Sequence, residues 1–173
     1  MKKFPFLLLD AGPVIKLFEL GIWDVFITKC DVTISRTVAA EAQYASLEFE
    51  DICINLDDYE EQELIEIFDV ELTNVKDFHE KFDQQYKVSI HPGEKETLAF
   101  LYNSSENWRL CSSDGAVFRV LGLLQRGEQG ISLEEVLKEI GLSRELKWPY
   151  TKKFRENYTL LGQIDSIQNK GLI

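Results

Sequence analysis

Apolar and polar positions divide the first part of the chain into a strand pattern followed by a helix pattern. Residues 4–9 (FPFLLL) are a continuous apolar run that ends at Asp10, which is typical of a strand buried on both faces. Gly12-Pro13 turns the chain, and apolar residues then recur at helical spacing over 14–18. Because proline is accepted in the first turn of a helix, this stretch predicts a buried strand, a turn and a helix.

The next part of the chain, up to residue 90, is predicted as short elements and an acidic stretch. Val32-Thr33-Ile34 is β-branched, and Ser35 or Thr37 is suited to cap the helix behind it. The charged faces of the last two helices predicted here indicate solvent-exposed surface. The elements expected are a helix over 21–28, a strand over 32–34, a helix over 38–44, a strand over 52–56, and helices over 61–68 and 75–86.

The remainder resumes a regular order of elements after the break at His91-Pro92-Gly93. Ser132 and Glu135 have the spacing of a capping box at the start of a helix, and Gly141 is suited to the position after its end. After Trp148-Pro149 an apolar periodicity predicts a helix that packs on the domain or on a partner. The elements expected are a helix over 94–102, a strand over 108–111, a helix over 116–124, a loop over 127–130 and a helix over 132–140.

The alternation of strands and helices predicts the fold class and the domain division. Strands separated by helices are typical of an α/β domain with a mainly parallel central sheet. We expect one such domain over residues 1–147, including a helical, acidic segment over 46–90, and a C-terminal helical tail over 148–173. A length of 173 residues agrees with one domain and an appendage.

Composition and cysteine content narrow the class of protein. At 45% hydrophobic residues the chain can bury a core, yet no apolar run reaches the roughly 18 residues that span a bilayer. The apolar run after Lys2 and Lys3 is too short for a secretory signal peptide. Three widely spaced cysteines and two histidines argue against a zinc site and indicate reduced thiols in a cytoplasmic protein.

The net charge of −11 excludes one way of binding nucleic acid but leaves another. Binding through a broadly basic surface requires positive charge that this chain lacks. Carboxylates gathered around a divalent cation would instead present a positive centre within an acidic protein. The positions of the acidic residues along the predicted elements therefore matter more than their number.

Acidic residues from four separate segments are expected at one edge of the predicted sheet. Asp10 and Asp114 follow directly after two predicted strands, and Glu41 lies in the helix after a third. Glu94 and Glu96 lie in the first turn of a later helix. In parallel sheets, ligands bind beyond the carboxyl ends of the strands. Each acid also has a purely structural role open to it, as a turn residue, a helix cap or a solvent-exposed side chain.

A gathering of carboxylates predicts a divalent metal site. The acids repel one another when no cation is present, and this repulsion raises their pKa values. Oxygen donors suit Mg²⁺ or Mn²⁺, and such an ion acidifies a bound water and offsets charge on a phosphoryl oxygen. The chemistry indicated is hydrolysis of a phosphodiester by an enzyme with Mg²⁺ or Mn²⁺ as its cofactor.

Four motifs in this order and spacing resemble the PIN domain family. They are LLLDAGPVIKLFELG (7–21), ISRTVAAEAQY (34–44), HPGEKETLAFLY (91–102) and LCSSDGAVFRVLGLL (110–124). The likeness is greatest to the branch with a DAGPLI-type first motif and a GExEA-type third motif. It covers about residues 4–124, with most of the acidic segment poorly matched.

The resemblance implies a three-layer α/β/α PIN-like fold and a Mg²⁺- or Mn²⁺-dependent ribonuclease. RNA is then the substrate, and no membrane is involved. Many proteins of this kind are toxins of toxin–antitoxin pairs, so the resemblance also implies an antitoxin protein as a partner and a homodimer as the assembly. By their matching positions, Asp10 is the first acid of the family, Glu41 the second and Asp114 the last. Ser112 or Ser113 matches the small hydroxyl residue that precedes the last acid.

The third acid of the family has two candidates in this chain. Glu96 is followed by Thr97-Leu98-Ala99, which is similar to the family pattern, and it is favoured over Glu94. Two positions along a helix are separated by about 200°, so both are not expected to face one metal. The expected catalytic residues are Asp10, Glu41, Glu96 and Asp114, and Glu94 joins them as a candidate metal ligand.

Basic residues near the motifs are candidates for substrate contact, and other functions stay open. Lys16, Arg36 and Arg119 are placed to contact phosphate, although each also suits an exposed surface position. The alternative function is a non-catalytic PIN-like interaction module, in which the acidic segment or the tail binds a protein. A phosphotransferase with Asp10 as nucleophile would require an aspartate at position 12, where this chain has Gly12.

Overall fold

The protein has a parallel central sheet, as the sequence predicted. In the computed structural model, which describes residues 2–173, five strands form this sheet and every neighbouring pair runs parallel. A separate antiparallel hairpin consists of β3 (Tyr44–Leu47) and β4 (Glu50–Cys53). The central strands lie in the order β5 (Glu66–Phe68), β2 (Cys30–Ser35), β1 (Phe4–Leu9), β6 (Arg109–Cys111) and β7 (Gly130–Ile131).

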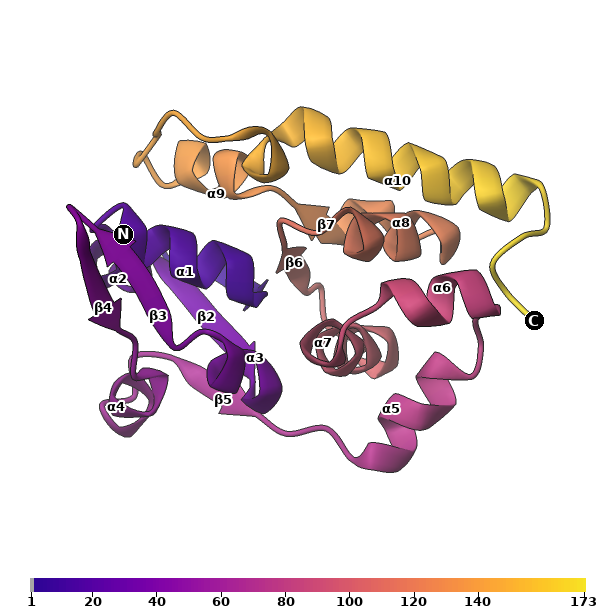
Figure 1. The fold of residues 1–173 in the computed structure, drawn as a ribbon, viewed down its shortest axis with the longest axis horizontal. Helices are drawn as coiled ribbons and strands as arrows, with labels where there is room; N and C mark the ends of the chain where they lie inside the picture. The colour runs from indigo at the N-terminus through magenta and orange to yellow at the C-terminus, as the bar shows by residue number, and fades with distance from the viewer. Residues whose placement is uncertain (1) are drawn as a thin grey trace.

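Helices cover both faces of the sheet and complete three layers, α/β/α (Figure 1). One face is covered by α1 (Ala11–Glu19), α2 (Trp23–Lys29) and α9 (Leu133–Glu139). The opposite face is covered by α5 (Leu72–His79), α6 (Gln84–Ser89), α7 (Pro92–Asn103), α8 (Gly115–Leu123) and α10 (Lys152–Ile167). Connections contain α3 (Arg36–Glu41), α4 (Leu56–Glu61) and two 3-10 turns, Gly127–Gln129 and Trp148–Tyr150. Within residues 2–173, no helix combines the length and the apolar character needed to cross a membrane.

Strand β1 lies at the centre of the sheet because its residues are apolar on both faces. Leu7 and Leu9 belong to one half of the core, and Leu8 belongs to the other. All three side chains are fully buried, as expected for a strand covered by helices above and below. Because β1 pairs with β2 on one edge and with β6 on the other, its carboxyl end lies at the middle of one edge of the sheet.

A strand replaces the helix predicted over 61–68, and that prediction is wrong. Ile65 and Ile67 are buried, whereas Glu66 between them is exposed, which is the alternation of a strand. The resulting β5 pairs with β2 at the edge of the sheet. Short apolar stretches of this kind do not distinguish strand from helix until they have a neighbour to pair with.

Two other helices predicted in this part of the chain differ in extent. The one predicted over 38–44 ends at Glu41, and Tyr44 begins β3 instead. The one predicted over 75–86 is divided into α5 and α6, because the Asp83 side chain caps a new helix. The helices on either side of this part match their predicted positions more closely.

Helix caps were predicted correctly at three places. The Ser35 hydroxyl accepts a hydrogen bond from the Val38 N–H at 3.1 Å. Ser132 and Glu135 form the expected capping box, with the Ser132 hydroxyl accepting from the Glu135 N–H at 3.2 Å and Glu135 Oε2 accepting from the Ser132 N–H at 2.9 Å. Gly141 follows α9 with a φ of +76°, a conformation that glycine adopts without a steric penalty.

The C-terminal helix packs on the domain, alongside α8 (Figure 1). Glycines bring the two helix backbones into contact. A Cβ at Gly162 of α10 would overlap the Arg119 carbonyl oxygen, and a Cβ at Gly122 of α8 would overlap the Thr159 carbonyl oxygen. No larger side chain is accommodated at either position unless the helices move apart.

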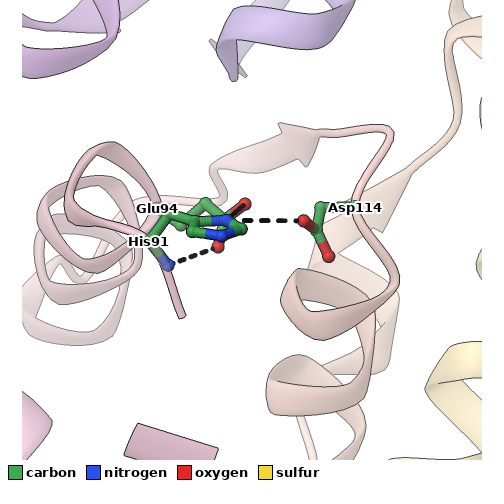
Figure 2. A group of neighbouring side chains, drawn as sticks. All are labelled: His91, Glu94 and Asp114. Carbon is green, nitrogen blue, oxygen red and sulfur yellow. Dashed lines mark hydrogen bonds and ion pairs between the residues drawn. The ribbon is translucent and has the colours of Figure 1, made fainter. Parts of the chain in front are cut away.

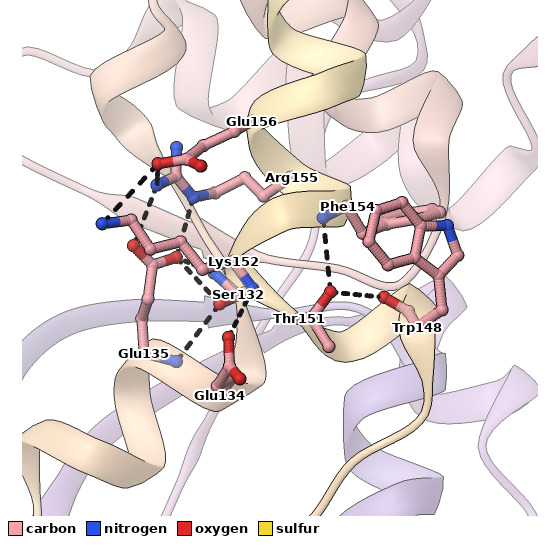
Figure 3. Close-up of polar contacts among 9 residues, drawn as sticks. All are labelled: Ser132, Glu134, Glu135, Trp148, Thr151, Lys152, Phe154, Arg155 and Glu156. Carbon is pink, nitrogen blue, oxygen red and sulfur yellow. Dashed lines mark hydrogen bonds and ion pairs between the residues drawn. The ribbon is translucent and has the colours of Figure 1, made fainter.

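Ion pairs and hydrogen bonds add to this contact. Arg155 donates from Nε and Nη2 to the two carboxylate oxygens of Glu135, at 2.7 and 2.8 Å (Figure 3). Asp165 Oδ2 accepts from Arg119 Nε at 2.7 Å and from the Tyr86 hydroxyl at 2.5 Å. The tail therefore interacts with α6, α8 and α9 through buried and half-buried polar groups.

Candidate metal centre

The order of the strands reverses at β1, and this defines where a site is expected. From β1 the chain continues to β2 and β5 on one side of the sheet, and later to β6 and β7 on the other. In α/β folds the carboxyl ends of strands at such a reversal are the usual ligand-binding position. Asp10 directly follows β1, and Ser112 directly follows β6.

Asp10 is a buried acid that is held by three hydrogen bonds. Its N–H donates to the Cys111 carbonyl oxygen at 3.0 Å. Its Oδ1 accepts from the Ala11 N–H at 2.9 Å, and its Oδ2 accepts from the Ser112 hydroxyl at 2.7 Å. Burial raises the pKa of Asp10 above its usual range, and the negative charges of Glu41 and Asp114 raise it further.

Asp114 shares the Ser112 hydroxyl with Asp10. The Asp114 N–H donates to Ser112 Oγ at 3.0 Å, so one buried serine joins the ends of β1 and β6. Asp114 Oδ1 accepts from the Ala116 N–H at 2.8 Å and caps α8. Both aspartates therefore have the structural capping roles that the sequence also allowed, and they still lie at one edge of the sheet.

His91 and Glu94, at the start of α7, lie beside Asp114 (Figure 2). Glu94 Oε2 accepts from the His91 N–H at 2.8 Å. The other oxygen, Oε1, lies 3.3 Å from His91 Nδ1, and the same ring nitrogen lies 3.7 Å from Asp114 Oδ2. Donor atoms of these three residues all lie within 4.8 Å of one another.

The charges in this group perturb one another. Burial raises the pKa of Glu94 to about 7, and the negative charges of Asp10 and Asp114 add to this effect. The hydrogen bond and charge of Glu94 raise the pKa of His91, and Asp114 and Glu41 add smaller effects. The site therefore attracts positive charge, which is the behaviour expected of a cation-binding position.

Glu41 reaches the same region from the end of α3. Its side chain lies over Gly93, where a Cβ would stand 2.8 Å from Glu41 Oε2. The charge of Glu41 contributes to the raised pKa values of Asp10 and His91. The exposed position of Glu41 places it at the outer side of the group.

Glu96, the acid favoured over Glu94 as the third acid, lies outside the group of His91, Glu94 and Asp114. Its Oε2 accepts from the Thr37 N–H at 3.1 Å, at the start of α3. Glu94, two positions earlier, lies in one group with Asp114, and the charge of Asp10 also acts on its pKa. Because residues two apart on a helix point in nearly opposite directions, α7 presents one acid to the site and uses the other to cap α3.

The three basic residues proposed for substrate contact are paired within the chain. Lys16 Nζ lies 2.9 Å from Glu19 Oε2. Arg36 pairs with Asp57 at 2.8 Å and with two further acids. Arg119 lies against Asp165, on the side of α8 that faces the tail. A free basic surface for phosphate is therefore not provided by these side chains.

The two serines before Asp114 have different positions. Ser112 is the one that contacts Asp10, and Ser113 packs against Gly12 so closely that a Cβ at Gly12 would overlap its hydroxyl.

His91 was not predicted as a site residue. The spacing of His91 and Glu94 in His-Pro-Gly-Glu is that of a capping box, in which the residue before a helix and the residue three positions later hydrogen-bond to each other. This spacing was the feature of the sequence that could have placed His91 beside Glu94.

Side chains from the residue after β1, from the end of α3, from the start of α7 and from the connection between β6 and α8 thus form the candidate centre. They are Asp10, Glu41, His91, Glu94, Ser112 and Asp114. Comparisons with protein-family models, with curated proteins and with solved structures find no match to this chain. The support for a function comes from the geometry of these residues and from the motifs that contain them.

Proposed function

We propose that this protein is a PIN-like ribonuclease that hydrolyses phosphodiester bonds with Mg²⁺ or Mn²⁺. The observation that carries the proposal is the gathering of three acids where the strand order reverses: Ser112 joins Asp10 to Asp114, and Glu94 lies in one group with Asp114. A divalent ion bound there would acidify a water molecule and offset charge on a phosphoryl oxygen. The motifs that resemble the PIN domain support RNA as the substrate.

The donor atoms suit a divalent cation. The carboxylates of Asp10, Glu94, Asp114 and Glu41 supply oxygen ligands, which Mg²⁺ and Mn²⁺ accept. Neighbouring negative charge contributes to the raised pKa of Glu94, and a cation would reverse that contribution. This electrostatic complementarity is the physical argument for metal binding.

Hydrogen bonds orient the acids before a ligand binds. Ser112 fixes one oxygen of Asp10, and the His91 N–H fixes Oε2 of Glu94. The other oxygen of Glu94, Oε1, lies 3.3 Å from Nδ1 of the His91 ring. Side chains that are held in this way lose less freedom when they bind an ion or a substrate.

The proposal includes a setting and two partners. We place the activity in the cytoplasm, where the three free cysteines would stay reduced. The family resemblance supports an antitoxin protein as one partner and a second copy of the chain as the other. Neither partner is needed for the hydrolysis itself.

A cleavage assay with matched variants tests the proposal. The purified chain is incubated with labelled single-stranded RNA in Mn²⁺, in Mg²⁺ and in a chelator. We expect metal-dependent cleavage that falls by about 100-fold or more in the double variant Asp10→Asn, Asp114→Asn. The control Asp58→Asn, Glu61→Gln removes the same charge from exposed positions of α4 and is expected to cleave normally. Cleavage that persists in the first variant would contradict the proposal.

A non-catalytic interaction module is the second candidate. It is favoured by the internal pairing of Lys16, Arg36 and Arg119, and by the exposed aromatic rings of Tyr44 and Phe49 on the hairpin. Calorimetric titration with Mn²⁺ distinguishes the two functions. Absence of both metal binding and RNA cleavage would support the interaction module, whereas metal binding with cleavage would exclude it.

A further inference from the structure

We propose that His91 is a ligand of the metal and makes the centre prefer Mn²⁺ to Mg²⁺. The inference rests on the proposed metal-dependent function and adds a nitrogen donor to a set of oxygen donors. Two observations lead to it: the position of the His91 ring between Glu94 and Asp114, and the hydrogen bond that fixes the backbone of His91 to Glu94.

The distances agree with three ligands of one ion. Nδ1 of His91 lies 3.3 Å from Glu94 Oε1 and 3.7 Å from Asp114 Oδ2. Adjacent ligand atoms on an octahedral ion with bonds of about 2.1 Å lie about 3 Å apart, and opposite ones lie about 4.2 Å apart. The three donor atoms, which lie within 4.8 Å of one another, therefore need small side-chain rotations to bind one ion.

The backbone keeps the ring at this place. His91 is extended, with φ −78° and ψ 163°, and it precedes Pro92 at the start of α7. Its N–H donates to Glu94 Oε2, so the residue that carries the ring also orients the neighbouring carboxylate. The ring is two-thirds exposed, so solvent water can reach it and can exchange with it as a ligand of a bound ion.

The chemistry of the donor separates the two metals. Mg²⁺ binds oxygen almost exclusively and retains several waters, whereas imidazole nitrogen is a good ligand for transition metals. The carboxylates of Asp10, Glu94 and Asp114 do not by themselves distinguish Mg²⁺ from Mn²⁺. The other histidine, His79, lies against the Lys87 carbonyl oxygen in a different part of the molecule, so His91 is the nitrogen donor of this centre.

Binding measurements on the full chain test the inference. Mn²⁺ affinity is measured by electron paramagnetic resonance, and Mg²⁺ affinity by competition against Mn²⁺. In His91→Asn, which replaces the nitrogen by an amide oxygen, we expect the Mn²⁺ affinity to fall by at least about fivefold. The Mg²⁺ affinity is expected to change by less than about twofold. His79→Asn is the matched control, and it is expected to keep the wild-type ratio of affinities.

A spectroscopic readout reports the bond itself. Electron spin-echo modulation of bound Mn²⁺ is expected to show a directly coordinated ¹⁴N in the wild type and in His79→Asn, and to lose it in His91→Asn. With two histidines in the chain, the assignment needs no further labelling. Nitrogen coupling that is absent from the wild type, or an unchanged ratio of affinities in His91→Asn, would overturn the inference.

The outcomes also separate this inference from the proposed function. If the wild type binds Mn²⁺ and Asp10→Asn, Asp114→Asn does not, the proposed centre stands whatever the result for His91. If the wild type binds neither Mn²⁺ nor Mg²⁺, both the centre and the role of His91 are overturned. If binding survives in the double aspartate variant, the ion is held elsewhere and both are likewise overturned.

Discussion

The hydroxyl of Ser112 donates to Asp10 Oδ2 across the centre of the sheet, at 2.7 Å, between residues 102 positions apart in the chain. Both side chains are buried. The same hydroxyl accepts from the Asp114 N–H, so its two bonds set the relative positions of the two aspartates. The proposed site therefore depends on Ser112, which is not itself proposed as a metal ligand.

Ser112→Ala is expected to weaken both stability and metal binding. Asp10 would lose the hydrogen bond that opposes the effect of burial on its pKa, and an unpaired buried acceptor costs about 1–3 kcal/mol. Urea denaturation measures the loss of stability, and calorimetry measures the loss of Mn²⁺ affinity. Ser113→Ala removes a neighbouring hydroxyl that does not contact Asp10, and it is expected to leave Mn²⁺ affinity unchanged. Equal effects of the two substitutions would contradict the role given to Ser112.

Glu94→Gln is expected to stabilise the protein in a chelator and to remove its stabilisation by metal. Burial and neighbouring charges raise the folded-state pKa of Glu94 to about 7, above its unfolded value of about 4.3. The folded state therefore binds more protons between these values, and its stability falls as pH rises from about 4.5 to 7. At pH 8, glutamine is expected to add about 1–3 kcal/mol to the free energy of unfolding.

The comparison is made by urea denaturation at pH 4.5 and pH 8. The advantage of the variant is expected to shrink at the lower pH, where the wild-type carboxyl is also neutral. Glutamine retains an oxygen that accepts from the His91 N–H, so the helix start is preserved. An advantage that is independent of pH would contradict the electrostatic explanation.

Glu135→Gln is expected to destabilise the protein at neutral pH and to have a smaller effect in acid. Burial raises the pKa of Glu135, but hydrogen bonds from Arg155 and Ser132 outweigh burial and lower it overall. A lowered folded-state pKa gives stability that is present above the unfolded pKa and is lost as pH falls through the folded value. The expected loss at pH 7 is about 1–3 kcal/mol.

Urea denaturation at pH 7 and pH 3 measures this difference. Asp31→Asn alters an exposed partner of Lys3, which lies outside the tail, and is expected to change the free energy of unfolding by less than about 0.5 kcal/mol. If Glu135→Gln were as mild as this control at pH 7, the Arg155–Glu135 pair would not hold the tail in place.

Gly162→Ala is expected to destabilise the protein, although alanine is the better helix former. Helix propensity alone predicts a gain of about 1 kcal/mol. The added Cβ would overlap the Arg119 carbonyl oxygen, and separating packed elements costs about 1–3 kcal/mol. The sign of the change in melting temperature distinguishes the two effects, and a rise would contradict the close contact between α8 and α10.

The sequence was sufficient to predict those elements whose signal was local or repeated. The apolar run before Asp10 predicted the central strand, and the cap at Ser35 and the capping box at Ser132 marked the starts of two helices correctly. These features depend on residues a few positions apart. The α/β class followed from their order, since alternating strands and helices have few other ways to pack.

The sequence was insufficient to predict the structure of a segment, or the position of a side chain, that is determined by a partner distant in the chain. Residues 66–68, the end of the helix predicted over 61–68, become a strand because β2 is available to pair with them. Glu96 lies apart from His91, Glu94 and Asp114, because its carboxylate accepts a hydrogen bond from the Thr37 N–H at the start of α3. His91 joins the centre because of where Asp114 lies. None of these relationships is visible in the spacing of residues along one segment.

The parallel pairing of β1 with β6 has a consequence for the order in which the molecule is made. Leu9 lies opposite Cys111, so β1 keeps one edge unpaired until most of the chain has been synthesised. Contacts of such long range require the closure of a long loop before they stabilise the fold. Asp10 meets Ser112 and Asp114 in that same step. The acids of the candidate centre are therefore brought together only after residues 109–114 have been synthesised.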